Sequence, residues 1–518
     1  MTQVLIMTAI VIYLLGMLAV GVVYSKKNNS VDDFYLGGRK LGPFVTAMSA
    51  EASDMSSWLL MGLPGVAYLT GMAEAGWTAI GLAVGTWLNW LIVAKRIRRY
   101  SQKLDAITVP QFFSKRWGDD KYMLSAMSAV IIIVFFIPYT ASGFSACGKL
   151  FSTLFGASYV SMMIVGAIFV LLYTLLGGFL AESASDFMQG VVMFTALICI
   201  VAIGTVNAGG LGAVVENAKS IPGFFEFFGI ANPELNEAGQ QIAQNGVPVF
   251  GPSSEYGLLK ICSMLAWGLG YFGMPQVLLR FMAIRREDEL KMSRRIAMVW
   301  VVISLGVAVF IGIMGRALYP TEHLTASAAE NIFITLATNA LPPLLAGFVM
   351  AGILAATISS SDSYLLIAAS AVAKNVYQGV VRKRATDKQV MTVTRITLLT
   401  IALIAIVIAL DEDSIIFNVV SFAWAGFGAT FGPLMLFSLF WKRINRAGAV
   451  AGMVSGAAMV FLWKLVISPL GGIFAIYELL PAFIVSSLCI VVVSLLTKAP
   501  SKELEEDFEA VKNGHGVA

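Results

Sequence analysis

Charged residues are scarce in this chain of 518 residues: Asp, Glu, Lys and Arg together make up 13%, against 58% hydrophobic residues. A soluble globular protein carries about 25% charged residues, which cover its surface with polar groups. With a mean hydropathy of +0.81, this chain needs lipid over much of its surface. The composition therefore predicts an all-α polytopic membrane protein whose constant partner is the lipid bilayer.

Histidine and cysteine are also scarce. Two histidines cannot build a multi-histidine metal site, and the four cysteines show no CxxC pairing. The sequence therefore argues against a zinc site or a disulfide framework. A net charge of +4 is too small to indicate nucleic acid as a partner. Residues 1–23 have no charge before their apolar stretch, which indicates a retained helix rather than a signal peptide.

Long apolar runs are abundant. A helix needs about 20 largely apolar residues to cross a bilayer, and the sequence predicts about thirteen transmembrane helices. They lie near 4–24, 43–70, 74–94, 122–150, 158–181, 187–208, 257–279, 296–318, 341–373, 392–410, 414–440, 447–467 and 474–497. Two long runs, 43–70 and 341–373, contain small polar clusters, so we expect each of them to bend or break.

The distribution of basic residues predicts the orientation. If the N-terminus is outside, 30 of the 35 Lys and Arg residues fall in segments on the cytoplasmic side, as the positive-inside rule requires. This places the N-terminus out and the C-terminus in, with one transmembrane domain over about 1–500 and a short cytoplasmic tail, 501–518. The outer segment 209–256 could form a short amphipathic helix and lid or a connector, and we favour the connector.

Two spans are interrupted by Gly, Pro and polar residues. One covers residues 47–65 and the other residues 267–275, and five helices separate their starts, so they enter the membrane from opposite sides. Interrupted helices in corresponding positions of two inverted halves indicate the central site of a transporter. The alternative is two ordinary kinked helices, because Gly and Pro are common in membrane spans.

Ionisable residues inside spans are costly and therefore indicate function. They are Glu51, Asp54, Glu182, Asp186 and Asp362. Glu182 and Asp186 stand near a span end, where a water interface is an alternative explanation. For Glu51, one helical turn before Asp54, we predict a carboxyl that holds a proton in at least one transport state or faces a polar partner on another span. An equally open alternative is a buried acid bonded to backbone freed by the break.

Small polar residues on the ninth span suit a hard monovalent cation. The carbonyl of Ala356 shares a helix face with the hydroxyls of Ser359 and Ser360. Two carbonyls from the break in span 2 would complete five neutral oxygens, a set that suits Na⁺. Close helix packing explains the same residues equally well.

Near the breaks, free amides and the predicted mid-span aromatic residues suit a small zwitterion. These residues are Trp58, Tyr139, Trp267 and Tyr271.

At these residues the sequence resembles the sodium/solute symporter family, and within it the bacterial sodium/proline symporters. The resemblance runs from about residue 3 to residue 440. It rests on seven stretches: 36–39, 53–65, 139–143, 177–179, 267–273, 280–284 and 351–356. Such motifs are specific for the family and less decisive for the solute, because related members carry sugars, sialic acid, iodide, pantothenate or choline-like compounds.

The resemblance implies a LeuT-type fold with two inverted five-helix repeats. The repeats would cover about 42–208 and 256–441, with extra helices at 4–24, 447–467 and 474–497. It also implies a multi-pass protein of the bacterial plasma membrane that couples inward Na⁺ flow to L-proline uptake, without an obligatory protein partner. The alternative is a sodium or proton symporter of the same fold for a different amino acid, a betaine or a carboxylate.

The resemblance also assigns roles to residues. The sodium ligands would be the carbonyls of Ala52, Met55 and Ala356 and the hydroxyls of Ser359 and Ser360. The proline site would involve Ser56, Trp58, Tyr139, Trp267, Tyr271 and Pro275. Asp54 would be essential for coupling, Asp186 would lie near the inner sodium route, and Arg39 would act in an inner gate.

The sequence departs from the proline-type pattern at three positions: Glu51 and Ser57 stand in place of glycines, and Met274 in place of a glutamine.

Other classes of membrane protein fit less well. A channel needs a continuous polar stripe along several helices, whereas the polar residues here are clustered at the breaks. An intramembrane enzyme needs a nucleophile or metal dyad, and no span contains HExxH. A transporter-like sensor needs a signalling domain, for which the segment 501–518 is too short. The sequence therefore predicts a transporter and not an enzyme.

Overall fold

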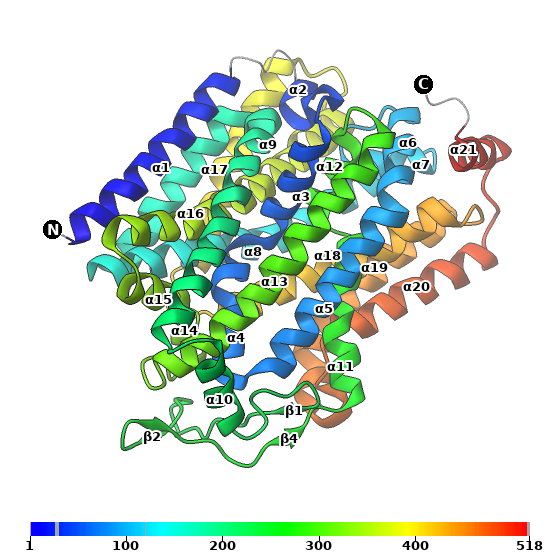
Figure 1. Ribbon diagram of the computed structural model, residues 1–518. Helices are drawn as coiled ribbons and strands as arrows, with labels where there is room; N and C mark the ends of the chain where they lie inside the picture. The colour runs from blue at the N-terminus through cyan, green and yellow to red at the C-terminus, as the bar shows by residue number, and fades with distance from the viewer. Residues whose placement is uncertain (1, 26–30, 120, 515–518) are drawn as a thin grey trace.

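The computed structural model describes residues 2–25, 31–119 and 121–514, which form one bundle of helices with two small two-stranded sheets at one end (Figure 1). The helices of the first half are α1 Thr2–Ser25, α2 Val31–Leu36, η1 Gly37–Arg39, α3 Pro43–Ser57, η2 Trp58–Gly62, α4 Leu63–Thr70, α5 Met72–Leu88, η3 Asn89–Val93, α6 Ala94–Lys103, α7 Val109–Arg116, α8 Met123–Phe155, α9 Tyr159–Asn207 and α10 Leu211–Ser220.

The second half follows the four short strands, β1 Gly229–Ile230, β2 Ala243–Gln244, β3 Val247–Pro248 and β4 Ser254–Glu255. Its helices are α11 Leu258–Leu265, η4 Ala266–Phe272, α12 Pro275–Ala283, η5 Glu287–Glu289, α13 Leu290–Leu318, α14 Ala326–Ala329, α15 Ile332–Ala340, α16 Pro343–Ser370, η6 Ala371–Val381, α17 Asp387–Ile408, α18 Ile416–Phe440, α19 Arg446–Leu462, η7 Trp463–Ile467, η8 Ser468–Leu470, η9 Gly472–Phe474, α20 Leu479–Leu496 and α21 Lys502–Asn513.

Within the described ranges, ten helices are long and apolar enough to cross a membrane, or eleven if the bent pair α11–η4 and α12 is one span. This is the architecture of a multi-pass membrane protein. The runs 158–181 and 187–208 both lie in α9, which turns at Gly178, where φ is 67°. The run 43–70 is divided into α3, η2 and α4. The total of thirteen spans and the sidedness of the termini stay predictions.

The break that was predicted as an alternative to a bend within 341–373 is absent from most of that run. Helix α16 continues without a non-helical residue to Ser370, and only from Ala371 does it change to the wider π-helical winding of η6. The serines do not interrupt α16 because their hydroxyls bond to carbonyls one turn back, as Ser360 does with Ala356 at 2.8 Å and Ser363 with Ser359 at 3.0 Å.

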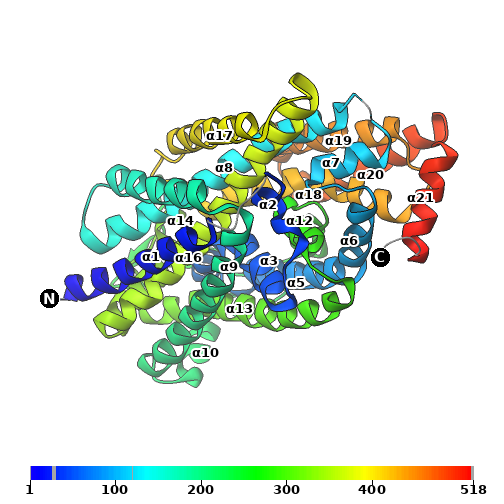
Figure 2. The ribbon, with the colours of Figure 1, turned by 90° about the horizontal axis from the view of Figure 1, so that it is seen from above.

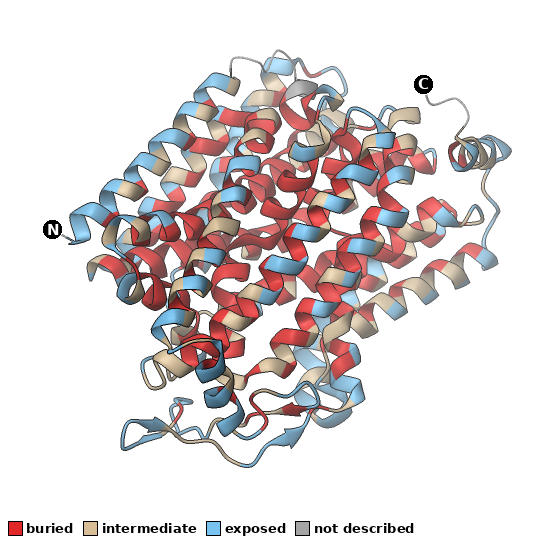
Figure 3. Ribbon diagram, in the orientation of Figure 1, coloured by how far each residue is buried: buried red, intermediate tan, exposed pale blue. Residues whose placement is uncertain are grey.

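Burial identifies the centre of the bundle. Every residue of α16 from Val349 to Ser370 is buried, and α16 packs against α9, α1, α8 and α3. Exposed apolar side chains line the periphery instead, as on α1 and α20, where lipid would cover them (Figure 3). Helix α21 lies at the edge of the bundle beside α6 (Figure 2), with Phe508 and Val511 buried.

The segment 209–256 is folded rather than a bare connector. It contains α10 and pairs β1 with β4 and β2 with β3, both antiparallel. Side chains from the bundle hold it in place: the indole N–H of Trp77 donates to the Phe227 carbonyl at 2.7 Å, and Arg316 donates to Oε1 of Gln241 at 3.0 Å. We call this end of the bundle the strand end, and the opposite end, which holds η1, the Arg39 end (Figure 1).

Candidate functional site

The chain through 43–70 breaks at Ser56, where φ is 50° and ψ is −173°. A non-glycine residue in this region of backbone space costs about 1–3 kcal/mol and marks functional sites more often than ordinary turns. The serine hydroxyl compensates in part, because it accepts a hydrogen bond from the backbone N–H of Trp58 at 3.2 Å. The break therefore has its own cap and leaves carbonyls of α3 without helical partners.

Three successive carbonyls before the break accept hydroxyl groups from other helices. The carbonyl of Ala52 accepts from Ser359 at 2.7 Å, that of Ser53 from Tyr364 at 3.3 Å, and that of Asp54 from Tyr139 at 3.4 Å. These contacts bring α16 and α8 against the broken part of α3. The break thus creates a group of backbone oxygens in the buried middle of the bundle.

Of the five predicted sodium ligands, one pair makes contact between α3 and α16, because the Ser359 hydroxyl donates to the carbonyl of Ala52. The others lie on the same two helices, but each has a local partner. The Ser360 hydroxyl donates to the Ala356 carbonyl at 2.8 Å, and the Met55 carbonyl accepts the N–H of Trp58. All five residues are buried. An ion here would replace hydrogen bonds that the oxygens otherwise make to one another.

An aromatic cavity lies next to the break. It brings together four of the six predicted solute-site residues, Trp58, Tyr139, Trp267 and Tyr271, with Asp54, Met55, Leu82, Val420 and Trp424 completing its lining. The rings of Trp58 and Trp267 have centroids 5.3 Å apart, and Phe417 stacks on Trp58 at 5.7 Å. The free volume is only about 10 Å³, room for about one water molecule. A solute requires this cavity to widen.

Helix α18 contributes to this cavity, which was not predicted from the sequence. Val420 and Trp424 line it, and Phe417 lies against Trp58 and Trp267. The spacing of these residues, i, i+3 and i+7, places them on one face of a helix and is a signal that the sequence contains. This spacing was not distinctive, because most of 414–440 is apolar.

The remaining two predicted solute-site residues, Ser56 and Pro275, are buried but do not line the cavity. Ser56 caps the chain at the break, as described above. Pro275 is the first residue of α12 and is separated from η4 by two residues, and α11–η4 and α12 are bent by 42° at this break. Met274 precedes it and is fully buried. The predicted interruption at 267–275 is therefore present, and Pro275 lies at the bend.

Two carboxylates lie on α3 near the cavity. Asp54 lines the cavity, and its Oδ1 has no hydrogen-bond partner among the described residues. Glu51 accepts a hydrogen bond from the indole N–H of Trp90 at 3.0 Å, while its Oε2 has no described partner. Trp90 of η3 is thus a polar partner on another span, as one branch of the prediction for Glu51 requires, and the contact is not one with freed backbone.

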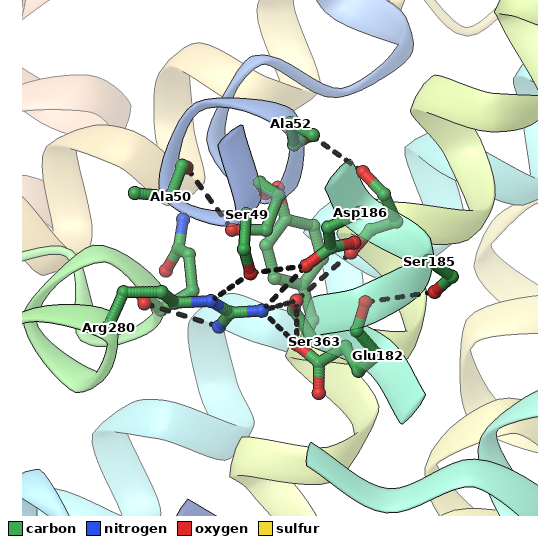
Figure 4. A network of polar contacts seen from close by, with 12 residues as sticks. Ser49, Ala50, Ala52, Glu182, Ser185, Asp186, Arg280 and Ser363 are labelled. Atoms are coloured by element: carbon green, nitrogen blue, oxygen red, sulfur yellow. Dashed lines mark hydrogen bonds and ion pairs between the residues drawn. The ribbon is translucent and has the colours of Figure 1, made fainter. Parts of the chain in front are cut away.

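A buried ion network lies beside the sodium candidates (Figure 4). Arg280 of α12 pairs with Glu182 and with Asp186 of α9, the latter at 3.1 Å. Ser49 donates to Asp186 at 2.6 Å, and the Arg280 guanidinium donates to Ser49 at 3.0 Å and Ser363 at 2.9 Å. The interface explanation for Glu182 is wrong, because its side chain is 4% exposed. The network joins α3, α9, α12 and α16.

At the Arg39 end, arginines close the bundle by binding carbonyls. Arg39 donates to the Met282 carbonyl at 2.6 Å and to the Ala106 carbonyl at 2.7 Å, and Arg98 donates to the Ile284 carbonyl at 2.6 Å. Burial, assisted by the positive charge of Arg98, lowers the pKa of Arg39 to about 10, so Arg39 stays protonated at neutral pH. These contacts tie η1, α6 and the end of α12 together.

At the strand end, a buried ion pair holds the beginning of α18. Lys149 of α8 lies 2.9 Å from Glu330, and both side chains are almost fully buried. The same carboxylate accepts the backbone N–H groups of Ile416 at 3.0 Å and Phe417 at 2.9 Å. A carboxylate is stabilised at a helix N-terminus. Glu330 therefore fixes the turn of α18 that carries Phe417 over the aromatic cavity.

Broken helices meet at a buried polar and aromatic cavity, and polar contacts close the bundle at both of its ends. This arrangement defines a secondary transporter rather than a channel or an enzyme. The sequence model of the Sodium:solute symporter family matches residues 34–456. The chain belongs to this family, which confirms the resemblance and the expectation that the protein is a transporter and not an enzyme.

Curated relatives match over almost the whole chain. The osmoregulated proline transporter OpuE of Bacillus subtilis is 41% identical over 95% of this chain and 94% of its own. The sodium/proline symporter of Haemophilus influenzae is 41% identical over 98% of this chain and 97% of its own. The sodium/proline symporter of Escherichia coli is 40% identical over 96% and 94%.

Solved structures share the fold at low sequence identity. A Na⁺-coupled sialic acid symporter in a substrate-bound outward-open state superposes with a TM-score of 0.75 at 16% identity, covering 96% of this chain and 99% of its own. Mhp1, a nucleobase-cation-symport-1 family transporter in a closed conformation, gives a TM-score of 0.51 at 12% identity, covering 92% and 98%. The expected transporter fold is thereby confirmed.

Proposed function

We propose that this protein is a symporter that couples inward Na⁺ flow to the uptake of L-proline by alternating access. The observation that carries the proposal is the position of the aromatic cavity directly beside the α3 break, where Ser359 contacts the Ala52 carbonyl. An organic solute and a monovalent cation would share α3 as a common wall. The names of the full-length relatives favour proline as that solute.

The cavity has the chemistry for a small imino acid. The faces of Trp58 and Trp267 suit an apolar ring and a cationic nitrogen. Oδ1 of Asp54, which has no hydrogen-bond partner in the described part of the chain, belongs to a residue of the same wall. The carboxylate of the solute would take backbone N–H groups of α3 or η4 that the interruptions leave outside regular helix. Ser56 and Pro275 would act by fixing the two interruptions rather than by touching the solute.

Sodium would bind the oxygens of Ala52, Met55, Ala356, Ser359 and Ser360. These are neutral groups, so the ion would bring a net charge to the middle of the bundle. Asp54 and the network of Asp186 and Arg280 supply the nearby charges. Sodium that leaves this site toward the Arg39 end would pass Asp186, so this acid would lie on the inner route. The hydrogen bonds from Arg39 to carbonyls would form the inner gate.

Alternating access requires the two closures to open in turn. In the proposed thirteen-span topology the strand end is extracellular and the Arg39 end cytoplasmic, in a bacterial plasma membrane. Movement of α18 and the Glu330–Lys149 pair would open the cavity to the outside. Loss of the hydrogen bonds from Arg39 and Arg98 to carbonyls would open it to the inside. The small cavity volume fits a state in which both closures are made.

Uptake into proteoliposomes tests the proposal. Purified protein, reconstituted with an inward sodium gradient, should concentrate labelled L-proline, and replacement of the gradient by potassium should abolish accumulation. Unlabelled cyclic imino acids should compete, whereas betaine, pantothenate and sugars should not. Competition by betaine or a carboxylate without competition by imino acids would identify another solute, and accumulation driven by a proton gradient alone would replace sodium as the coupling ion.

A further inference from the structure

A second polar pocket lies at the Arg39 end, away from the aromatic cavity. Its lining consists of Gln111, Tyr122, Lys374, Asn375, Gln378, Gly379 and Lys383, and its volume is about 230 Å³. We call it the η6 pocket. It is joined to the Arg39 closure through the loop before α7: Thr108 bonds to Asn375 at 3.0 Å, and Ala106, two residues earlier, accepts from Arg39.

The lining carries positive charge and polar groups. Lys374 and Lys383 are its two charged residues, and Gln111 and Gln378 contribute amides. The Lys383 ammonium lies 5.5 Å from the ring centre of Tyr122. Among the described residues that line the pocket, none is acidic. Lysines at this end of a membrane protein follow from the positive-inside rule alone, so the charge by itself does not indicate a ligand.

The buried amide of Asn375 is the feature that the positive-inside rule does not explain. The residue is 1% exposed, and its Nδ2 has no hydrogen-bond partner among the described residues. The Thr108 hydroxyl accepts the N–H of Gln111 at 3.2 Å and donates its own proton to Oδ1 of Asn375 at 3.0 Å, which leaves Nδ2 as the amide atom without a described partner. A buried N–H donor without an acceptor costs about 1–3 kcal/mol.

We propose that the η6 pocket binds a phosphate-bearing anion. Phosphate offers acceptor oxygens in several directions, which match an amide donor at the wall of the pocket and two ammonium groups in its lining. Lysine is a common phosphate ligand in proteins. The same phosphate chemistry is present in a soluble phosphate monoester and in the headgroup of an anionic phospholipid such as phosphatidic acid.

Occupation of the η6 pocket would connect two parts of the transporter. Gln111 and Tyr122 lie on α7 and before α8, whereas the other five residues lie on η6 and the residues after it. Helix η6 directly continues α16, which carries Ser359 and Ser360. An anion held between these elements would fasten the end of α16 to the loop that Arg39 binds. The unusual π-helical winding of η6 is in keeping with a functional site.

Binding is tested without any transport measurement, so the result is independent of the proposed proline uptake. The soluble arm titrates sn-glycerol 3-phosphate into detergent-purified protein and follows binding by calorimetry. The lipid arm measures phosphatidic acid retained by the protein in native mass spectrometry, with phosphatidylcholine as the comparison lipid. Asn375→Asp keeps the acceptor for Thr108 but replaces the N–H donor by an oxygen. Lys383→Ala removes one pocket charge, and Lys388→Ala removes an exposed charge of α17 outside the pocket.

In at least one arm, the wild-type protein and Lys388→Ala should bind equally, while Asn375→Asp and Lys383→Ala each lose at least tenfold in affinity or retention. Binding in the soluble arm alone identifies a soluble phosphate ester, and retention in the lipid arm alone identifies a headgroup. Unfolding temperatures within a few degrees of wild type verify the fold of each variant. The proposal is overturned if neither probe binds, or if Asn375→Asp and Lys383→Ala bind as Lys388→Ala does.

Discussion

Single serine hydroxyl groups determine which carbonyls near the α3 break have a hydrogen-bond partner. Ser359 donates across to the Ala52 carbonyl, whereas Ser360 donates along its own helix. If both oxygens bind sodium, Ser359→Ala and Ser360→Ala should each raise the sodium concentration for half-maximal proline uptake. A lost hydrogen-bonding or ligand oxygen costs about 1–3 kcal/mol, which corresponds to about one to two decades in affinity.

Ser370→Ala is a matched control for these two variants. Ser370 is a buried serine of the same helix whose hydroxyl donates to the Ile367 carbonyl at 2.8 Å. Its removal should leave the sodium dependence unchanged. An unaltered sodium response in well-folded Ser359→Ala and Ser360→Ala proteins would exclude the two hydroxyls as ligands.

Glu51 gives a second prediction at this scale. Because its Oε1 accepts the Trp90 indole N–H, we expect the residue to serve as a hydrogen-bond acceptor for η3. Glu51→Gln offers a carbonyl oxygen at the same position and should keep both the pH profile of uptake between about pH 5.5 and 8 and the sodium response. Glu51→Leu leaves the buried indole N–H unpaired and should lower the free energy of unfolding by about 1–3 kcal/mol.

The alternative is a carboxyl that titrates during transport. In that case Glu51→Gln would flatten the pH profile although the protein remains as stable as wild type. Two measurements on wild type, Glu51→Gln and Glu51→Leu separate the two explanations. They are uptake at a fixed sodium concentration between about pH 5.5 and 8, and thermal unfolding.

Among the elements, α18 depends on charges that lie outside it. Glu330 binds both the first amides of α18 and Lys149. Removal of one member of a buried ion pair costs about 3–5 kcal/mol, because the remaining charge stays buried without a partner. Glu330→Gln should therefore lower the unfolding temperature strongly. It should also weaken proline binding, because the turn of α18 that carries Phe417 loses its anchor.

A double replacement separates these two effects. Lys149→Met with Glu330→Gln removes both charges, and its unfolding temperature should recover toward wild type, since apolar replacement of a buried pair is often neutral. Proline affinity should stay reduced, because the α18 amides still lack a carboxylate. Recovery of both properties would show that Glu330 acts on stability alone.

The connection between α13 and α15 contains a pH-dependent contact. His323 bonds to the Thr335 hydroxyl at 2.8 Å, and burial together with the charge of Arg316 lowers its pKa from 6.5 to about 4. Between these two values the unfolded segment binds more protons than the folded one, so stability is lost as the pH falls from about 6.5 toward 4. After solvent screening is allowed for, the effect is of order 1 kcal/mol.

Hydrogen exchange of residues 319–335 measures this effect. Exchange should be faster at pH 5 than at pH 7 after correction for the intrinsic pH dependence, and His323→Gln should remove most of the difference. An equal difference in both proteins would place the titrating group elsewhere.

For the whole molecule, much of the transporter architecture followed from hydropathy and composition. Apolar runs located the long helices, and the clusters at 53–65 and 267–275 located the two interruptions, because Gly, Pro and small polar residues disfavour continuous helix. The unbroken α16 was not predicted, since serine hydroxyls that bond back to their own helix look the same in sequence as those that leave it.

The candidate site was only partly accessible from the sequence. The four aromatic residues from η2, α8 and η4 were found because they lie near polar interruptions. The contribution of α18, the partner of Glu51 on η3 and the pairing of Arg280 with Glu182 all depend on which helices become neighbours. Such contacts join residues far apart in the chain, and no local period in the sequence specifies them.

The crowding of indole rings around the cavity also makes the molecule its own optical sensor. Three of its ten tryptophans, Trp58, Trp267 and Trp424, line the cavity, with ring centroids 5.3 Å apart for the first pair and 6.2 Å for the second. A solute that widens the cavity must separate or reorient these rings and bring a zwitterion against them. Near-ultraviolet dichroism and intrinsic emission would then report occupancy directly, without a label attached to the chain.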